Sequence, residues 1–317
     1  MNAIRVSAFG EPAVLDYVEV PTLSREPGQV LVRLHAAGVN PVEAYVRAGK
    51  YARLPALPYT PGTDGAGVVA AADDAGLVGK RVYTAGSVTG TYAEEALCTP
   101  EQVHPLPDHV SYEQGAALGV PYATAAWALF KRGGARAGET LLIHGASGGV
   151  GLAAVQLAKE AGLRIIGTAG TAEGIELILR NGAEAAFNHH DADYLSRMQA
   201  AVGGSGFDII LEMMANKNLG KDLPLLAKYG RVVVVGSRGP VEIDARNLML
   251  READIRGITL FSATPADLVE IHGRIGAGLA DGALAPVIGA SVPLREAARA
   301  HELIMGSGAR GKIVLTM

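Results

Sequence analysis

Residues 141–151 read Leu-Leu-Ile-His-Gly-Ala-Ser-Gly-Gly-Val-Gly, an apolar run followed by a cluster of glycines. The run 140–143 has no polar face, which is typical of a buried parallel strand. Helical spacing resumes over 152–159, so the glycines form a turn between a strand and a helix. The N–H groups at a helix start favour a phosphate, and glycines let it approach the backbone. This stretch therefore predicts a dinucleotide-binding turn.

Two other interpretations of this turn are open. The glycine spacing is G-x-x-G-G-x-G, a variant of the common G-x-G-x-x-G pattern. Gly145, Ser147 and Gly149 also spell G-x-S-x-G, the nucleophile elbow of α/β hydrolases, which likewise connects a strand to a helix. A tight turn that binds no ligand is the third possibility. The rest of the chain has to decide between them.

Composition excludes several classes of protein. The 317 residues are 49% hydrophobic and 19% charged, which indicates a globular chain long enough for two domains. The net charge of −4, without a basic block, argues against a general nucleic-acid surface. The single cysteine, Cys98, excludes an internal disulfide and a cysteine-based zinc cluster. No signal peptide or membrane span is predicted, so we expect a cytoplasmic protein.

The first 110 residues have the pattern of a β-rich, antiparallel unit. Strand-type residues alternate with Gly and Pro, and one short helix is expected over 42–48. The predicted strands are 4–8, 15–20, 30–36, 68–72, 80–85 and 91–97.

From about residue 115, strands alternate with helices, which predicts a doubly wound parallel sheet, the Rossmann arrangement. Strands are expected at 141–143, 164–168, 184–187, 207–212, 231–235 and 258–261, and helices at 114–117, 122–130, 151–161, 172–181, 194–202 and 219–228. The tail, with helices 265–280 and 294–306 and strands 285–288 and 312–316, has no place in this unit. We therefore expect domain one to comprise 1–118 and 264–317, with the nucleotide-binding domain 119–263 inserted and the ligand cleft between them.

This organisation resembles the medium-chain dehydrogenase/reductase superfamily, and within it the quinone oxidoreductases of the zeta-crystallin type. The resemblance covers nearly the whole chain and rests on several motifs, at 38–43, 58–62, 138–142, 146–151, 167–171, 234–239, 259–261 and 306–308. It implies a GroES-like first domain and NADPH-dependent, one-electron reduction of quinones by a homodimer or homotetramer.

The residues needed for a catalytic zinc ion are missing. Where the zinc alcohol dehydrogenases have a Gly-His-Glu stretch, this chain has Gly62-Thr63-Asp64, and Asn40 replaces a metal-binding cysteine. Zinc needs three or four Cys, His or carboxylate ligands at fixed positions. We therefore expect no metal, and we interpret Asp64 as a turn carboxylate.

Without a metal, neutral hydrogen-bonding groups must orient the substrate. Asn40 and Thr63 can hydrogen-bond, and tyrosine rings offer flat faces with a hydroxyl. The resemblance places Asn40 and Tyr45 beside the nicotinamide and Tyr51 at the substrate mouth. Asn40, Tyr45, Tyr51 and Thr63 are the predicted catalytic residues, although the residues alone favour a turn role for Asn40 before Pro41.

The expected cofactor is NADPH, because the acidic residue that binds the ribose of NAD after the second strand is absent from 167–171. The turn supplies Ser147, Gly148, Gly149 and Val150. Gly170, Thr171 and, by resemblance, His189 would surround the 2′-phosphate, although His189 alone could equally be a solvated loop residue. The resemblance adds Asn40, Tyr45, Asn218, Val235, Gly236, Ser237, Arg238, Ile258, Thr259, Leu260 and Phe261 as cofactor contacts.

Other functions remain to be tested. Reduction of an activated C=C bond, as in 2-alkenals, is compatible with the sequence. A hydrolase would need Ser147, with Asp208 and either His272 or His301 as partners. Zeta-crystallin relatives can also bind AU-rich RNA or serve as lens protein, but the net charge makes RNA a secondary prospect.

Overall fold

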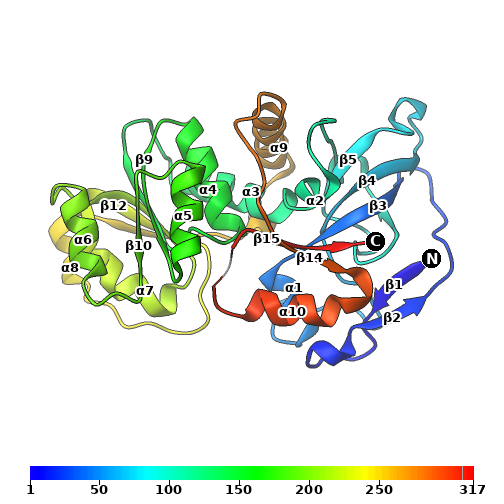
Figure 1. The fold of residues 1–317 in the computed structure, drawn as a ribbon, viewed down its shortest axis with the longest axis horizontal. Helices are drawn as coiled ribbons and strands as arrows, with labels where there is room; N and C mark the ends of the chain where they lie inside the picture. The colour runs from blue at the N-terminus through cyan, green and yellow to red at the C-terminus, as the bar shows by residue number, and fades with distance from the viewer. Residues whose placement is uncertain (309) are drawn as a thin grey trace. The chain divides into compact units, whose positions relative to one another are not determined.

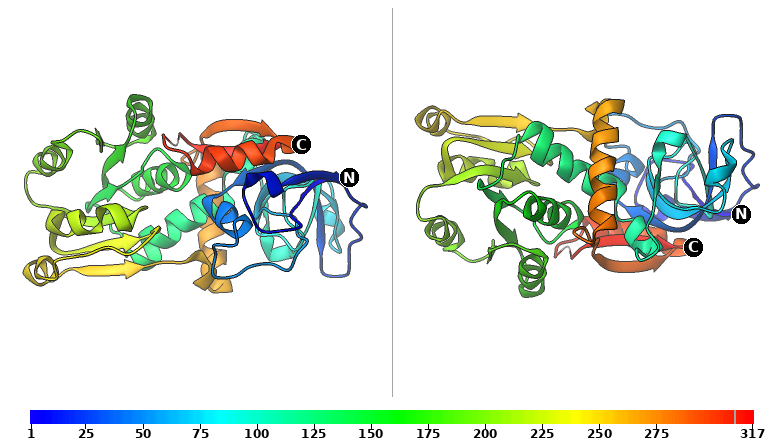
Figure 2. Two further views of the ribbon diagram at one scale, coloured as in Figure 1. Left: turned by 90° about the horizontal axis from the view of Figure 1, so that it is seen from below. Right: turned by 90° about the horizontal axis from the view of Figure 1, so that it is seen from above.

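The computed structural model describes residues 1–308 and 310–317 and divides the chain into two compact units. The β-rich unit comprises 1–120, 276–307 and 311–317, and the α/β unit comprises 121–275 and 308–310. These units divide the chain at 120/121 and at 275/276, the latter within a helix, where the sequence led us to expect 118/119 and 263/264. Both termini belong to the β-rich unit (Figures 1 and 2).

The α/β unit is built on a six-stranded sheet, counted over the described residues, in the order β10-β9-β8-β11-β12-β13. All its neighbouring strands are parallel. The order reverses between β8 and β11, which confirms the doubly wound arrangement and places the switch point beside the glycine turn. The strands are β8 (Thr140–Ile143), β9 (Arg164–Ala169), β10 (Ala185–Asn188), β11 (Phe207–Glu212), β12 (Leu226–Val234) and β13 (Asp254–Gly257).

Helices cover this sheet because its strands are apolar on both faces. Helix α4 packs on β8 and β9, and α5 packs on β9 and β10 (Figure 1). Leu142, Ile166 and Ile210 from neighbouring strands are fully buried in one core cluster with Leu223. The helices are α3 (Gly119–Ala126), extended by a π-helical turn (Trp127–Arg132), α4 (Gly149–Glu160), α5 (Ala172–Asn181), α6 (Tyr194–Ala201), α7 (Ala215–Asp222), α8 (Arg246–Arg251) and α9 (Pro265–Ala280).

The β-rich unit contains a sheet with the order β14-β15-β3-β4-β5-β7, and β6 also pairs with β3. Strand β15 pairs with β3 in antiparallel register, so the tail returns to the first domain as expected. The elements are β1 (Asn2–Arg5), β2 (Asp16–Glu19), β3 (Val30–Val39), α1 (Pro41–Arg47), β4 (Asp64–Ala71), β5 (Arg81–Ala85), β6 (Glu95–Cys98), β7 (Val103–Pro105), α2 (Tyr112–Gly115), β14 (Ile288–Pro293), α10 (Ala297–Met305) and β15 (Lys312–Thr316).

Three expectations about local structure were wrong. The helix expected over 219–228 ends at 222, and β12 begins at Leu226, because tertiary strand pairing overrides helix propensity there. The strand expected at 258–261 lies at 254–257 and is followed by a 3₁₀ turn at 260–262. The strand expected at 285–288 begins at 288, and it pairs with β15 in parallel.

Candidate functional site

The glycine turn joins β8 to α4 at the carboxyl edge of the parallel sheet. Gly145 has φ +60°, and the N–H of Ala146 donates to the carbonyl of Thr168 (2.8 Å), which ties the turn to β9. A Cβ on Gly151 would lie 2.6 Å from Ala146 Cα, so this glycine permits close packing of helix and turn. Gly148 is the N-cap of α4, whose first N–H groups have no partner within the helix. The arrangement fits a pyrophosphate.

The end of β9 carries no acid. Gly170 follows the strand, and Thr171 is the N-cap of α5, accepting a hydrogen bond from the Gly174 N–H (3.1 Å). A Cβ on Gly170 would lie 3.0 Å from Nε2 of both His189 and His190, so the structure brings Gly170, Thr171 and His189 together. Burial and the neighbouring histidine lower the pKa of His189. A neutral donor and a small residue are therefore what a 2′-phosphate would meet here.

The other predicted cofactor residues lie in segments that follow β11, β12 and β13. Asn218, on α7, donates to Glu212 Oε1 (3.2 Å). The N–H groups of Val235 and Gly236 donate to the Glu212 carbonyl (2.8 and 3.2 Å), so one residue anchors both segments. Ser237 and Arg238 are exposed, and Ile258, Thr259, Leu260 and Phe261 run from the end of β13 into the following turn.

The hydrolase interpretation fails on the position of its acid. Asp208 lies near the start of β11 and accepts the N–H of Thr140 (2.8 Å), at the start of β8. Ser147 follows β8 at the opposite, carboxyl edge of the same sheet. Asp208 therefore cannot orient a histidine at Ser147.

The sequence did not predict a buried group of polar residues that lies beside the glycine turn. We call His144, Thr168, Glu212 and Asp222 the His144 cluster. His144 Nε2 lies 2.8 Å from Asp222 Oδ1, and Nδ1 lies 3.2 Å from Thr168 Oγ1. The signal that the sequence offered was an ionisable residue directly at the end of two apolar strands, His144 after β8 and Glu212 at the end of β11.

This cluster also contains the one set of three potential metal ligands found in the described part of the chain, with donor atoms within 4.8 Å of one another. Two ligands of a tetrahedral zinc ion, at about 2.0–2.1 Å from the metal, are about 3.3 Å apart. The 2.8 Å between His144 Nε2 and Asp222 Oδ1 is instead the length of a direct hydrogen bond. We therefore describe the group as hydrogen-bonded.

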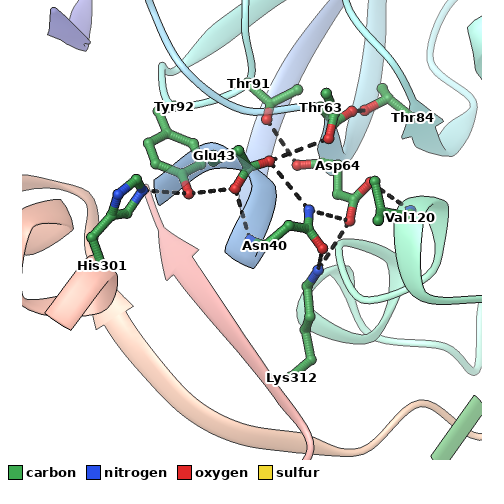
Figure 3. Close-up of polar contacts among 10 residues, drawn as sticks. All are labelled: Asn40, Glu43, Thr63, Asp64, Thr84, Thr91, Tyr92, Val120, His301 and Lys312. Atoms are coloured by element: carbon green, nitrogen blue, oxygen red, sulfur yellow. Dashed lines mark hydrogen bonds and ion pairs between the residues drawn. The ribbon is translucent and has the colours of Figure 1, made fainter. Parts of the chain in front are cut away.

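In the β-rich unit, Asn40 is at the centre of a second polar network (Figure 3). It is the N-cap of α1 and is only 3% exposed. Its Nδ2 donates to Asp64 Oδ2 (2.9 Å) and Glu43 Oε1 (3.2 Å), and its Oδ1 accepts from Lys312 Nζ. Asn40 thus caps a helix, as its position before Pro41 indicates, and also links β4 to β15.

Asp64 is not the turn carboxylate that we expected. It is the first residue of β4, is fully buried, and pairs with Lys312 Nζ at 3.0 Å. Its second oxygen, Oδ1, accepts the N–H of Val120 (2.8 Å). The sequence could not reveal this role because Lys312 comes from the returning tail.

Glu43 connects Thr63 to a buried aromatic pair (Figure 3). Thr63 Oγ1 donates to Glu43 Oε1 (3.2 Å), and Tyr92 Oη donates to Glu43 Oε2 (2.8 Å). Tyr92 Oη also lies 3.2 Å from His301 Nε2. Burial raises the pKa of Glu43, which Lys312 partly opposes, and burial lowers the pKa of His301 to about 4. His301 is therefore neutral, and a proton is retained on Glu43 more readily than on an exposed glutamate.

The four predicted catalytic residues all belong to the β-rich unit but differ in surroundings. Asn40 and Thr63 share Glu43 as a partner. Tyr45 lies on α1 and is half-buried, and Tyr51 is half-buried in the loop that follows. The structure therefore joins Asn40 and Thr63 in one network, whereas Tyr45 makes no hydrogen bond to that network within the described residues.

No helix among the described residues is long and apolar enough to cross a membrane.

Comparisons with known proteins agree with this architecture. Residues 26–108 match the model of the alcohol dehydrogenase GroES-like domain, and residues 149–273 match that of the zinc-binding dehydrogenases. The human quinone oxidoreductase is 49% identical over 324 residues, spanning 100% of this chain and 98% of that protein, and the mouse protein is equally similar.

Solved structures give the same result. The Escherichia coli quinone oxidoreductase complexed with NADPH is 28% identical, with a TM-score of 0.89 and complete coverage of both chains. The quinone oxidoreductase from Thermus thermophilus is 32% identical, with a TM-score of 0.88 and the same coverage. The chain belongs to the quinone oxidoreductases of the zeta-crystallin type, within the medium-chain dehydrogenase/reductase superfamily.

Proposed function

We propose that this protein catalyses the NADPH-dependent reduction of quinones. The observation that carries the proposal is at the carboxyl edge of the parallel sheet. There, the glycine turn stands next to the end of β9, where Gly170 follows the strand in place of an acid and lies against His189, which follows β10. The names of the human and Escherichia coli relatives support the same activity.

The residues of the α/β unit fit NADPH. Ser147, Gly148, Gly149 and Val150 would hold the pyrophosphate at the start of α4, where the helix dipole favours an anion. Gly170, Thr171 and His189 would hold the 2′-phosphate. Asn218, 235–238 and 258–261 would complete the site along the later strand ends.

NADPH supplies the reducing equivalents when it is bound. In the proposed reaction the nicotinamide and the quinone meet at the side chains of the Asn40 network. Thr63 has one hydroxyl proton, which it donates to Glu43 Oε1 in this structure, so it would hydrogen-bond a quinone oxygen by turning that proton from Glu43 to the quinone. Tyr45 would flank the nicotinamide, and Tyr51 would close the substrate mouth. These are neutral groups that orient both reactants without a metal.

An assay with two classes of acceptor tests this function. Purified protein should accelerate NADPH oxidation with 1,4-benzoquinone or 9,10-phenanthrenequinone more than with 2-alkenals. The reverse preference would assign the protein to the reduction of activated C=C bonds. No acceleration with either class would remove the proposed function altogether.

We also propose that the quinone is reduced in one-electron steps. Electron paramagnetic resonance during turnover should then show a quinone radical in proportion to the enzyme added. Formation of the hydroquinone without a radical signal would establish two-electron transfer instead.

We propose a homodimer in the cytoplasm as the working form, and two features of the α/β unit support the dimer. Strand β13 is at the edge of the sheet, where its outer hydrogen-bonding groups can pair with another chain. Met249 and Leu250, on α8, are 76% and 77% exposed, an apolar surface that a second copy would cover. A homotetramer would need a further surface of this kind.

A further inference from the structure

The His144 cluster has two carboxyl groups that face each other without a cation between them. Glu212 and Asp222 are both fully buried, and one carboxyl oxygen of each lies within 4.8 Å of the other and of a ring nitrogen of His144. Strand β11 places Glu212, and the last residue of α7 is Asp222. The sheet and this helix thus hold both groups out of water.

One oxygen of each carboxyl group accepts no hydrogen bond from the described residues. Glu212 Oε1 accepts from the Met214 N–H and from Asn218 Nδ2, and Asp222 Oδ1 accepts from His144. Glu212 Oε2 and Asp222 Oδ2 have no hydrogen-bond partner within the described residues. Ionised carboxylates only accept hydrogen bonds, so two ionised groups cannot satisfy each other. A single proton between the two carboxyl groups, which are close enough to hydrogen-bond each other, satisfies both groups.

The charges facing the pair support this assignment. His144 approaches from the end of β8, Lys221 from α7, Tyr194 from α6 and His189 from the end of β10. Of these four groups, His144 makes the direct contacts, at 2.8 Å from Asp222 and 3.8 Å from Glu212. One imidazolium can balance one carboxylate, so the second carboxyl group must be neutral for the site to be uncharged.

We propose that Glu212 keeps a proton shared with Asp222, and that this protonated form positions the NADPH-binding segments. This inference rests on the proposed function. Glu212 is a positioning residue: its Oε1 holds Asn218, and its carbonyl holds Val235 and Gly236. Loss of the proton sets two like charges against each other in a buried site and displaces α7 together with Asn218.

The proton is exchanged with solvent near neutral pH. Burial raises the pKa of Glu212 to about 7, and the charge and hydrogen bond of Asp222 act in the same direction, whereas His144 opposes them. An anionic cofactor bound at this edge makes the local potential more negative and raises this pKa further. NADPH binding must therefore take up a proton at pH 7.5–8, and NADPH must bind more tightly at lower pH.

The variant Glu212→Gln isolates this effect, because glutamine mimics the protonated acid. Its carbonyl can accept from Asn218, and its amide can donate to Asp222 at every pH. We would measure the NADPH dissociation constant by nucleotide fluorescence at pH 6 and pH 8.5. Between pH 6 and pH 8.5, the NADPH dissociation constant of the wild type, divided by that of the variant, should rise about tenfold. This is the factor expected if NADPH binding raises the pKa of Glu212 by one unit. Proton uptake, measured by calorimetry in buffers of different ionisation enthalpy, should be smaller in the variant at pH 7.5.

The exposed Glu160, at the end of α4, gives the matched control. Glu160→Gln should behave like the wild type in both measurements. A ratio that stays constant between pH 6 and 8.5 would overturn the proposal and leave Glu212 a purely structural residue. Stoichiometric divalent metal in the purified protein would also overturn it. If the wild type binds no NADPH at any pH, the proposed function itself is wrong, and this result differs from NADPH binding that does not depend on pH.

A measurement on the wild type alone covers the case in which Glu212→Gln does not fold. Infrared difference spectra between pH 6 and 8.5 should show the carbonyl stretch of a protonated carboxyl group that disappears at the higher pH. In Asp222→Asn, which removes the facing charge, this loss should occur at lower pH. No such band at pH 6 would show that both groups are ionised and would refute the proposal.

Discussion

Lys312 Nζ lies 3.0 Å from Asp64 Oδ2, although 248 positions of sequence separate the two residues. Both side chains are buried, and Asn40 bonds to each of them. This pair joins β4 to the last strand of the chain, β15. It thereby fixes the network from which the predicted catalytic residues Asn40 and Thr63 extend.

Removal of the cation should destabilise the β-rich unit. In Lys312→Met, Asp64 is left buried with an unpaired charge, which costs about 3–5 kcal/mol of unfolding free energy. Urea denaturation of the variant and the wild type measures the difference. Lys80→Met, at an exposed lysine, should change the unfolding free energy by less than about 0.5 kcal/mol. A stable Lys312→Met protein would show that the pair is dispensable.

Thr63→Val should impair catalysis more than stability. The variant keeps the shape of the side chain but loses the hydroxyl that bonds Glu43. We expect kcat with quinones to fall about tenfold, since about 1.4 kcal/mol of transition-state stabilisation corresponds to that factor. The NADPH dissociation constant should stay within about threefold of wild type, because the proposed phosphate contacts are in the α/β unit. Steady-state kinetics measure this effect, with Thr22→Val, at an exposed threonine, as the control that should keep the wild-type kcat. An unchanged kcat in Thr63→Val would show that Thr63 has no role in the mechanism.

Gly170→Asp should shift the cofactor preference from NADPH towards NADH. The new carboxylate stands at the end of β9, where it repels a 2′-phosphate and can accept hydrogen bonds from ribose hydroxyls. The ratio of kcat/KM for NADPH to that for NADH should drop at least about tenfold, or about 1.4 kcal/mol. Gly170→Ala separates the steric effect, since its Cβ would lie 3.0 Å from the two histidines. An equal loss in both variants would contradict the electrostatic explanation.

His301 should make the fold sensitive to acid. Its pKa is about 4 in the folded protein and about 6.5 when unfolded, so the unfolded state binds more protons in this window. Stability must therefore fall as the pH drops from 6.5 to 4, by an amount on the order of 3 kcal/mol for this group. His301→Gln, which keeps a donor for Tyr92, should lose less stability over the same range. Parallel denaturation curves at pH 7 and 4.5 test this, and an identical loss in both proteins would refute it.

A charge on the exposed face of α8 should separate the proposed dimer. Leu250→Asp places a carboxylate at a position that is 77% exposed in the single chain and would be buried in the dimer. Light scattering after size exclusion should give the monomer mass at micromolar concentration. Val78→Asp, at an exposed apolar residue of the β-rich unit, should leave the mass unchanged. A monomeric wild-type protein would contradict the proposed dimer.

The sequence by itself determined the parts of this protein that depend on local pattern. Apolar strands alternating with helices predicted the doubly wound sheet, and the glycines of 145–151 predicted the turn at its switch point. The absence of an acid after β9 could also be read directly. The borders of β12, β13 and β14 could not, because pairing with neighbouring strands sets where those strands begin and end.

Only the tertiary structure decided how the polar residues are partnered. The pair Asp64–Lys312 and the group His144–Glu212–Asp222 unite residues from distant segments. A sequence shows each of them as an isolated charge, which is normally solvated. Burial changes their chemistry, because a charge removed from water must be paired with an opposite charge or neutralised by a proton. That choice follows from distances between atoms, and these exist only in the folded chain.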